Sequence, residues 1–136
     1  MIVLNGKQIN KSEIRKLWDE CFAEDSMCWR DWYFDNVYDP KNILCVKQEG
    51  ELASMLFMNP YTLILRGAAI NTFSLAGVAT REKHRKCGLA GNLIKYSLQK
   101  AFKLGYSFSF LYPFKYGYYE KFGFKLSYYK YSYKKY

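Results

Sequence analysis

The sequence of 136 residues has one histidine, three prolines and four cysteines, and it contains no long apolar run. Lys or Arg interrupts every hydrophobic stretch before the length of about 20 residues that a membrane-spanning helix needs. The first residues lack the basic-then-apolar form of a signal peptide. Cys21, Cys28, Cys45 and Cys87 form no Cys-x-x-Cys pair, which indicates reduced thiols and neither a metal site nor a disulfide framework. We therefore expect a cytoplasmic protein that binds no metal and does not cross a membrane.

Acidic residues are scarce in the second half of the chain. Residues 1–60 hold seven Lys or Arg and ten Asp or Glu, a balance of −3, whereas residues 61–136 hold fourteen basic and two acidic residues, a balance of +12. Together the halves give the net charge of +9. A uniformly basic chain would favour nucleic acid as the partner. The uneven distribution instead favours an anionic ligand on the basic half and a cationic one on the acidic half, with merely solvated faces as the alternative.

Half of the residues are hydrophobic, which is enough for one substantial core, so we predict a single domain over residues 1–136. Apolar residues at helical spacing predict helices over 11–22, 29–37, 91–103 and 116–122. Turn residues between apolar runs predict strands over 42–47, 52–58, 61–65, 68–73, 75–80, 107–112 and 125–133. Pro60 is predicted to end the strand before it. Hairpins followed by alternating strands and helices indicate a mixed α/β fold.

The most informative segment joins a short apolar strand to a long amphipathic helix through a basic loop. The strand reads Gly-Val-Ala-Thr at residues 77–80, and the loop reads Arg-Lys-Cys-Gly-Leu-Ala at residues 85–90. The first turn of a helix has backbone N–H groups without an intrahelical partner, and Gly88 and Ala90 let an anion approach them closely. Gly-x-x-x-x-Gly-Lys-Ser/Thr and Gly-x-Gly-x-x-Gly are both absent, which excludes a Walker loop and a dinucleotide fingerprint. The pattern predicts a pyrophosphate-binding loop, with an ordinary helix start as the alternative.

Two segments resemble signatures of the GCN5-related N-acetyltransferases, the GNAT superfamily. Residues 85–90 are similar to its Arg/Gln-x-x-Gly-x-Gly/Ala signature, and Tyr-Tyr-Glu-Lys-Phe-Gly-Phe at residues 118–124 is similar to the segment that closes many of its active sites. The two follow in the expected order, one helix and one strand apart. Residues 33–38, 77–80 and 111–113 resemble more particularly the N-terminal domain of enhanced-intracellular-survival-type acetyltransferases, and the likeness extends over nearly the whole chain.

The resemblance implies a GNAT fold, in which a mostly antiparallel mixed sheet is flanked by helices and splayed between its fourth and fifth strands. It implies acetyl-CoA as co-substrate, with the pyrophosphate on the loop, the pantetheine arm along the preceding strand and a backbone N–H near Val78 facing the acetyl carbonyl. Tyr119 occupies the position from which a tyrosine protonates the coenzyme A thiolate in similar enzymes, and a phenol suits this because it is neutral at pH 7. The implied cofactor-binding residues are Val78, Ala79, Thr80, Arg85, Lys86, Cys87, Gly88, Leu89 and Ala90.

The activity that the resemblance implies is transfer of an acetyl group to a primary amine of a small molecule or peptide. No general base can be identified: Glu24, Asp25 and Asp35 fall in the region that lines the acceptor side in similar proteins, and a water relay would serve equally. We expect His84 on the surface or as a cap. Phe114 stands where similar sequences often have a small polar residue. Similar proteins continue beyond this sequence, so it corresponds to a fragment or a minimal relative, and self-association stays open.

Two other functions fit the same residues. The basic half could be a module that binds RNA or DNA, although an amine acceptor is the expected partner. The fold could also bind acyl-CoA without turning it over. Residues 126–136 alternate Tyr and Lys with Ser, which predicts an edge strand with a charged solvent face, or else a segment that stacks on bases and contacts phosphates.

Overall fold

The computed structural model describes residues 1–136 except Lys130, Ser132 and Tyr136. Its centre is a five-stranded sheet in the order β1-β2-β3-β4-β5. The first four strands pair antiparallel, and β4 pairs with β5 in parallel, so the predicted mixed sheet is confirmed. The strands are β1 Leu4–Asn5, β2 Ile43–Gln48, β3 Glu51–Leu65, β4 Ala68–Thr80 and β5 Ser109–Leu111.

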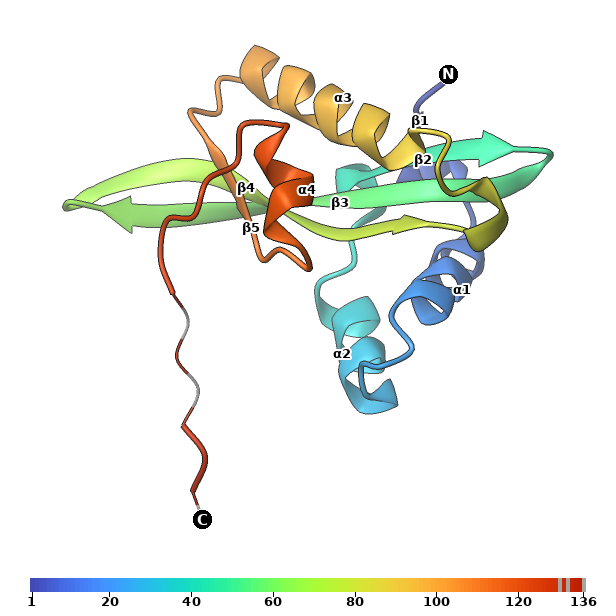
Figure 1. Cartoon of the computed structure of the whole chain (residues 1–136), viewed down its shortest axis with the longest axis horizontal. Coiled ribbons are helices and arrows are strands. Elements are labelled where there is room, and N and C mark those ends of the chain that lie inside the picture. The colour runs from blue at the N-terminus through green and yellow to red at the C-terminus, as the bar shows by residue number, and fades with distance from the viewer. Residues whose placement is uncertain (130, 132, 136) are drawn as a thin grey trace.

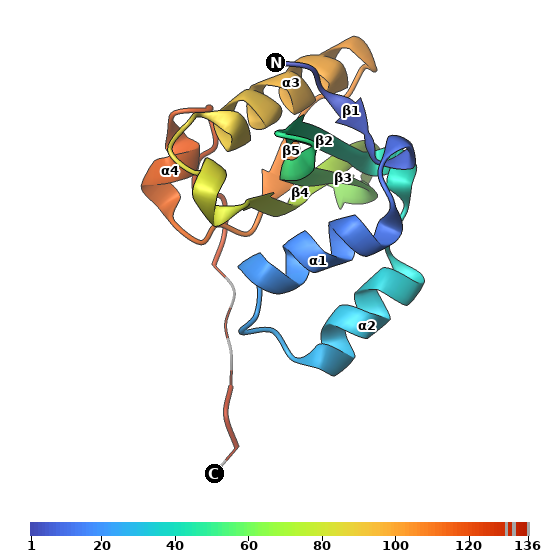
Figure 2. The same cartoon turned by 90° about the vertical axis from the view of Figure 1, so that its right-hand side faces the viewer.

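Helices cover both faces of the sheet, as Figure 2 shows. Helices α1 Lys11–Cys21 and α2 Met27–Asn36 lie on one face, and α3 Leu89–Lys103 and α4 Tyr116–Glu120 lie on the other. The predicted helices are confirmed with shifts of one or two residues at their ends. Short 3-10 helices form the connections η1 Gly6–Gln8, η2 Pro40–Asn42 and η3 Glu82–His84.

Each face of the sheet has its own apolar cluster. On the α1 and α2 face, the Trp18 ring is only 3% exposed and lies 4.8–5.5 Å from the rings of Tyr33, Phe34 and Phe57. On the opposite face, Leu93 and other residues of α3 pack against β4 and α4 in a more aliphatic cluster. The helical spacing of apolar residues produces both clusters, because α1 and α3 each bury one apolar stripe against the sheet.

Two-residue turns join β2 to β3 and β3 to β4. Glu49-Gly50 and Arg66-Gly67 all have positive φ, the type I′ pattern that matches the twist of a hairpin. The prediction that Pro60 ends a strand is wrong, since β3 continues to Leu65. Pairing with β2 stops at Phe57, so Pro60 lies where β3 has become an edge strand, and edge strands tolerate proline. The outer part of the β3–β4 hairpin projects from the body as an arm (Figure 1).

The predicted strand over 125–133 is wrong for the described residues, none of which is in a strand; residues 130 and 132 lie outside the described part. A strand with one solvent face should bury every second side chain. Leu126, Tyr128 and Tyr129 are instead all more than half exposed, so no apolar face holds this segment against the sheet.

Candidate active site

The loop between β4 and α3 presents an open row of backbone N–H groups. Gly88 begins α3 with a φ of 76°, in the left-handed region that glycine tolerates best. The loop before the helix is exposed. In the described part of the chain, no side chain caps α3 and no acceptor meets the N–H groups of Leu89, Ala90 and Gly91. These groups and the helix dipole form an anion-binding geometry at the predicted position.

The two cations of the loop differ in their surroundings. Arg85 turns back toward the sheet, where its Nε donates to the Thr80 carbonyl at 3.0 Å and its Nη2 lies 3.9 Å from Cys21 Sγ. Arg85 therefore ties the loop to the end of β4 and to α1, besides adding charge. Lys86 is exposed and has a positive φ of 63°, which is strained for a residue with a side chain.

His84 lies just before the loop, and of its two expected places, on the surface or as a cap, the surface is wrong. Its side chain is buried, and its Nε2 lies 2.9 Å from Glu51 Oε1. A hydrogen bond from Lys83, and to a smaller extent one from His84, holds the pKa of Glu51 below its usual value. Sequence spacing could not show this contact, because it depends on the β2–β3 turn folding against η3.

The sheet opens between β4 and β5. Their parallel pairing covers only Phe73, Ser74 and Leu75, so the remainder of β4 has no partner on that side within the described residues. A register shift in the β3–β4 ladder occurs at Gly77, whose φ is +56°. Such a bulge turns nearby backbone groups out of the ladder. This is the splay that the resemblance implies for the pantetheine arm.

The three strand residues assigned to the cofactor have different environments. Val78 is half-buried, whereas Ala79 is buried and its carbonyl accepts from Ser54 Oγ at 3.0 Å. Thr80 Oγ1 lies 2.9 Å from the same Ser54 oxygen. Ser54 thus braces the end of β4.

Tyr119 of α4 is 5% exposed and lies in the same apolar cluster as Leu89 and Leu93 of α3. Burial, with a smaller effect of the neighbouring Tyr118, raises the pKa of Tyr119 to about 12. The phenol is therefore neutral over the whole physiological range. Phe114, which departs from the pattern of similar sequences, is exposed and packs edge-on against Tyr119 with ring centroids 5.6 Å apart.

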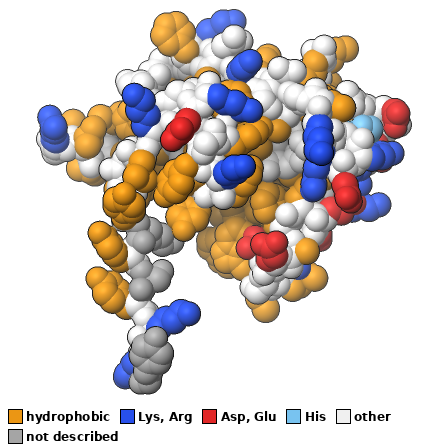
Figure 3. Space-filling view, in the orientation of Figure 1, with side chains coloured by type: hydrophobic (Ala, Val, Ile, Leu, Met, Phe, Trp, Pro, Cys, Tyr) orange, Lys and Arg blue, Asp and Glu red, His pale blue; other side chains and the backbone are white. Residues whose placement is uncertain are grey.

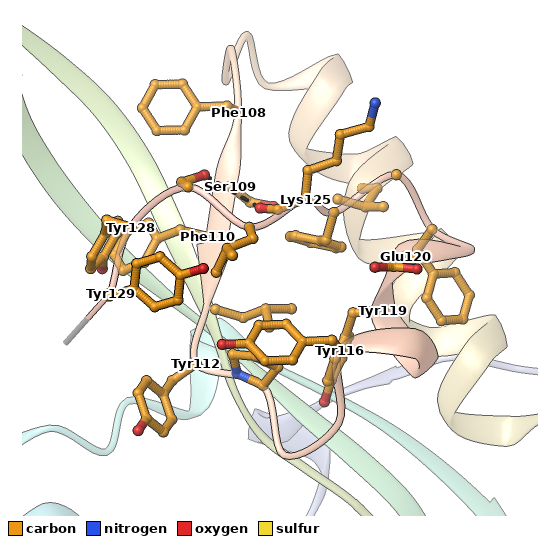
Figure 4. A pocket seen from close by; sticks show the side chains of 18 residues that line it. Phe108, Ser109, Phe110, Tyr112, Tyr116, Tyr119, Glu120, Lys125, Tyr128 and Tyr129 are labelled. Atoms are coloured by element: carbon orange, nitrogen blue, oxygen red, sulfur yellow. Dashed lines mark hydrogen bonds between the residues drawn. The ribbon is translucent and has the colours of Figure 1, made fainter.

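A hollow of about 1090 Å³ lies between β5, α4 and residues 122–129. Tyr119 and Tyr116 line it, whereas no residue of the 85–88 loop does. In Figure 4, the Tyr116 ring lies across the middle of the hollow, and the Tyr119 hydroxyl points away from Lys125. A methyl group on Gly91 would lie 3.4 Å from the Phe122 ring, so α4 and its following turn pack against the first turn of α3. Tyr119 thus lies between the hollow and the helix that begins at the loop.

The α1 and α2 side carries the acidic residues proposed for the acceptor. Glu24, Asp25 and Asp35 are exposed, and none of them pairs with a cation among the described residues. The exposed indole of Trp32 lies on the same helix as Asp35. Carboxylates and aromatic faces attract ammonium groups, so this side has the charge that an amine requires.

Trp18 and Gly77 form a structural link that the motifs did not reveal. A methyl group on Gly77 would overlap the Trp18 ring, so the bulge of β4 fits directly onto α1. The sequence carries a signal for this feature, because a lone glycine inside a strand pattern often marks a bulge or a close approach.

In the described part of the chain, no helix is long and apolar enough to cross a membrane. Among the same residues, no group of three or more His, Cys, Asp or Glu could hold a metal ion.

The model of the acetyltransferase (GNAT) domain matches residues 6–127. The chain therefore belongs to the GNAT acetyltransferase family. A search of curated proteins finds no match.

Solved structures show the same fold. The chain has a TM-score of 0.75 at 18% identity with a probable N-acyltransferase from Enterococcus faecalis, covering 90% of this chain and 31% of that one. It has a TM-score of 0.77 at 22% identity with a GCN5-related N-acetyltransferase from Anabaena variabilis, covering 88% of this chain and 30% of that one. The TM-score with a GNAT family acetyltransferase from Brucella melitensis, in complex with acetyl-CoA, is 0.75 at 22% identity, covering 92% of this chain and 82% of that one. The chain thus spans about a third of the first two relatives.

Proposed function

We propose that the chain is an acetyl-CoA-dependent N-acetyltransferase that transfers the acetyl group to a primary amine. The observation that carries the proposal is the free row of N–H groups on residues 89–91, which begins beside the unpaired edge of β4. Membership of the GNAT family supports the same reaction class. Closeness to enhanced-intracellular-survival-type proteins and a cytoplasmic location stay predictions.

The loop is the part that would hold the cofactor phosphates. The N–H groups of Leu89 and Ala90 fit a pyrophosphate, and the exposed Lys86 adds charge without a competing carboxylate among the described residues. The free edge of β4 fits the amide groups of a pantetheine arm, because an unpaired strand edge offers alternating donors and acceptors. The bulge beside Val78 is the proposed place for the acetyl carbonyl.

Acetyl transfer forms a C–N bond and breaks the C–S bond of the thioester; the nitrogen loses one proton and the sulfur gains one. Tyr119 is the proposed donor to the leaving sulfur. With a pKa of about 12, its hydroxyl keeps its proton at pH 7 and can donate a hydrogen bond to developing negative charge. The general base is not assigned, and Glu24, Asp25 and Asp35 stay the candidates.

Thermal unfolding with and without acetyl-CoA tests the loop. A ligand at about 100 times its Kd stabilises a protein by about 2.7 kcal/mol, and we expect a matching rise in Tm. Arg85→Glu with Gly88→Glu should abolish the rise, since both place negative charge at the phosphate position. Arg66→Glu with Gly67→Glu is the matched control, because it makes the same changes at another left-handed glycine, in the arm.

An undiminished rise in the loop variant would refute the site. A thiol-release assay over a panel of amines then separates an enzyme from a module that only binds acyl-CoA: binding without release for every amine would refute the enzymatic proposal while leaving the cofactor site intact.

A further inference from the structure

The cations of the C-terminal part lack carboxylate partners. From Arg85 onward the sequence holds eleven Lys or Arg and a single acidic residue, Glu120. Within the described residues, none of these cations lies within ion-pair distance of a carboxylate. In contrast, Arg15, Arg30 and Arg81 of the earlier part are all paired at 2.7–2.9 Å.

This excess is larger than the proposed co-substrate requires. Coenzyme A carries roughly four negative charges on its pyrophosphate and 3′-phosphate. The loop itself uses Arg85 and Lys86, and nine further cations follow it along α3, α4 and the C-terminal segment. Figure 3 shows Lys and Arg side chains spread over the α3 and α4 side with hydrophobic side chains between them.

Exposed tyrosines lie among these lysines around the hollow. Tyr116, Lys125, Tyr128 and Tyr129 line it, and Figure 4 shows these four side chains around its rim and centre. Tyr128 and Tyr129 are 73% and 67% exposed, so both rings are accessible to a ligand. Lys115 and Lys121 flank α4 and are exposed as well. We call these six residues the basic aromatic face.

The conformation of the C-terminal segment favours a ligand on this face. As an edge strand, residues 125–129 would have used their backbone and one row of side chains against the sheet. The structure shows no such pairing, so the rings of Tyr128 and Tyr129 stay available for stacking. Alternating rings and lysines are the chemistry that binds single strands, because bases stack on the rings and phosphates pair with the cations.

We propose that the basic aromatic face binds single-stranded nucleic acid. A lipid surface fits less well, because the face offers no amphipathic helix to insert: α4 has five residues and no described residue after it is helical. The face is separate from the cofactor loop, so the proposal does not depend on acetyl transfer.

Fluorescence anisotropy with a labelled oligouridylate of about 20 nucleotides tests the proposal. We expect binding that weakens steeply between about 50 and about 200 mM salt, because phosphate contacts release counterions. The variant Lys121→Gln/Lys125→Gln/Tyr128→Ser/Tyr129→Ser should bind about tenfold more weakly or worse. The matched control, Lys7→Gln/Lys16→Gln/Trp32→Ser/Phe102→Ser, removes the same charge and two exposed rings elsewhere and should bind within about twofold of the wild type.

Two further measurements identify the contact. Tyr128→Phe/Tyr129→Phe keeps the rings and should retain binding; a loss as large as that of the serine variant would refute stacking. Saturating acetyl-CoA should leave the affinity unchanged, and displacement would place the oligonucleotide on the cofactor loop and overturn the proposal. Equal weakening in the variant and the control, no binding at low salt, or a variant effect seen only with phosphatidylserine vesicles would also overturn it. Circular dichroism of each variant verifies the fold.

Discussion

The two faces of the sheet use charge in opposite ways. On the α1 and α2 face, Arg15 and Arg30 both bond to Asp19, and the rings around Trp18 form a closed core. On the α3 and α4 face, the lysines have no acidic partners among the described residues, and several rings are exposed. The difference indicates that the arginines of the first face serve stability, whereas the second face keeps its cations available for anions.

The largest expected effect on stability is at the contact between α1 and β4, where Trp18 meets Gly77. Gly77→Ala should lower the free energy of unfolding by about 3 kcal/mol or more, because its methyl group overlaps the Trp18 ring and its φ is +56°. Urea denaturation measures the change. Gly50→Ala is the matched control: its φ is +77° but nothing lies within 4 Å, so we expect only about 1 kcal/mol. Equal losses would show that backbone strain alone matters.

A second comparison uses one buried tyrosine from each face. Tyr119→Phe should lower kcat by about 10- to 100-fold with nearly unchanged acetyl-CoA binding, because only the proposed donor is lost. Tyr118→Phe controls for its neighbour and should change kcat little. Tyr33→Phe should instead cost about 1 kcal/mol of stability, because the Asn59 amide that donates to its hydroxyl at 2.6 Å loses a buried partner. Full activity of Tyr119→Phe would refute its role.

The raised pKa of Tyr119 gives the same comparison a pH dependence. The pKa of about 12 in the folded protein lies above the ordinary tyrosine pKa of about 10, so the stability linked to this group is complete below pH 10 and is lost as the pH rises through 12. The free energy of unfolding, measured by urea denaturation at increasing pH, should therefore fall less steeply between pH 10 and pH 12 in Tyr119→Phe than in the wild type. An identical slope would mean that the phenol ionises freely in the folded protein.

A smaller effect compares a paired cation with an unpaired one. Arg30→Met should destabilise the protein by about 1–2 kcal/mol, because Arg30 is 8% exposed and bonds to Asp19 at 2.7 Å, while Arg15 still compensates that carboxylate. Lys95→Met, on the exposed side of α3, should change stability by less than about 0.5 kcal/mol. A cost at Lys95 as large as that at Arg30 would remove the contrast between the faces.

The smallest effect separates strain from charge in the loop. Lys86→Gly should raise the free energy of unfolding by less than about 1 kcal/mol, because glycine relieves the strain of the positive φ. The same change should reduce the stabilisation by acetyl-CoA, because it removes a positive charge. Arg66→Gly, at a φ of 50° in the arm, should give the first effect without the second. If Lys86→Gly left the stabilisation by acetyl-CoA unchanged, Lys86 would not face the cofactor.

Local patterns predicted the parts of the fold that local physics determines. The apolar stripe of α3 and the glycines of both hairpin turns were sufficient, and the open N–H groups at the start of α3 followed from the strand, glycine and helix around Gly88. Contacts between distant segments were not predictable in this way. His84 of η3 is buried where Glu51 of the β2–β3 hairpin meets it. Pro60 is tolerated because the pairing of β3 with β2 ends at Phe57. The role of Tyr119 rested on resemblance alone, since its spacing does not show that α4 packs against α3.

The connections between strands also set an expected order of assembly. Strands β2, β3 and β4 are joined by two-residue turns, so they can zip together on the microsecond scale typical of hairpins. The parallel partner β5 arrives only after the chain has passed through α3, and such long-range closure is slower. We therefore expect the β4–β5 pairing beside the opening to form last. Ligand binding there would report that folding has reached its end, which a spectroscopic signal from the early hairpins would not.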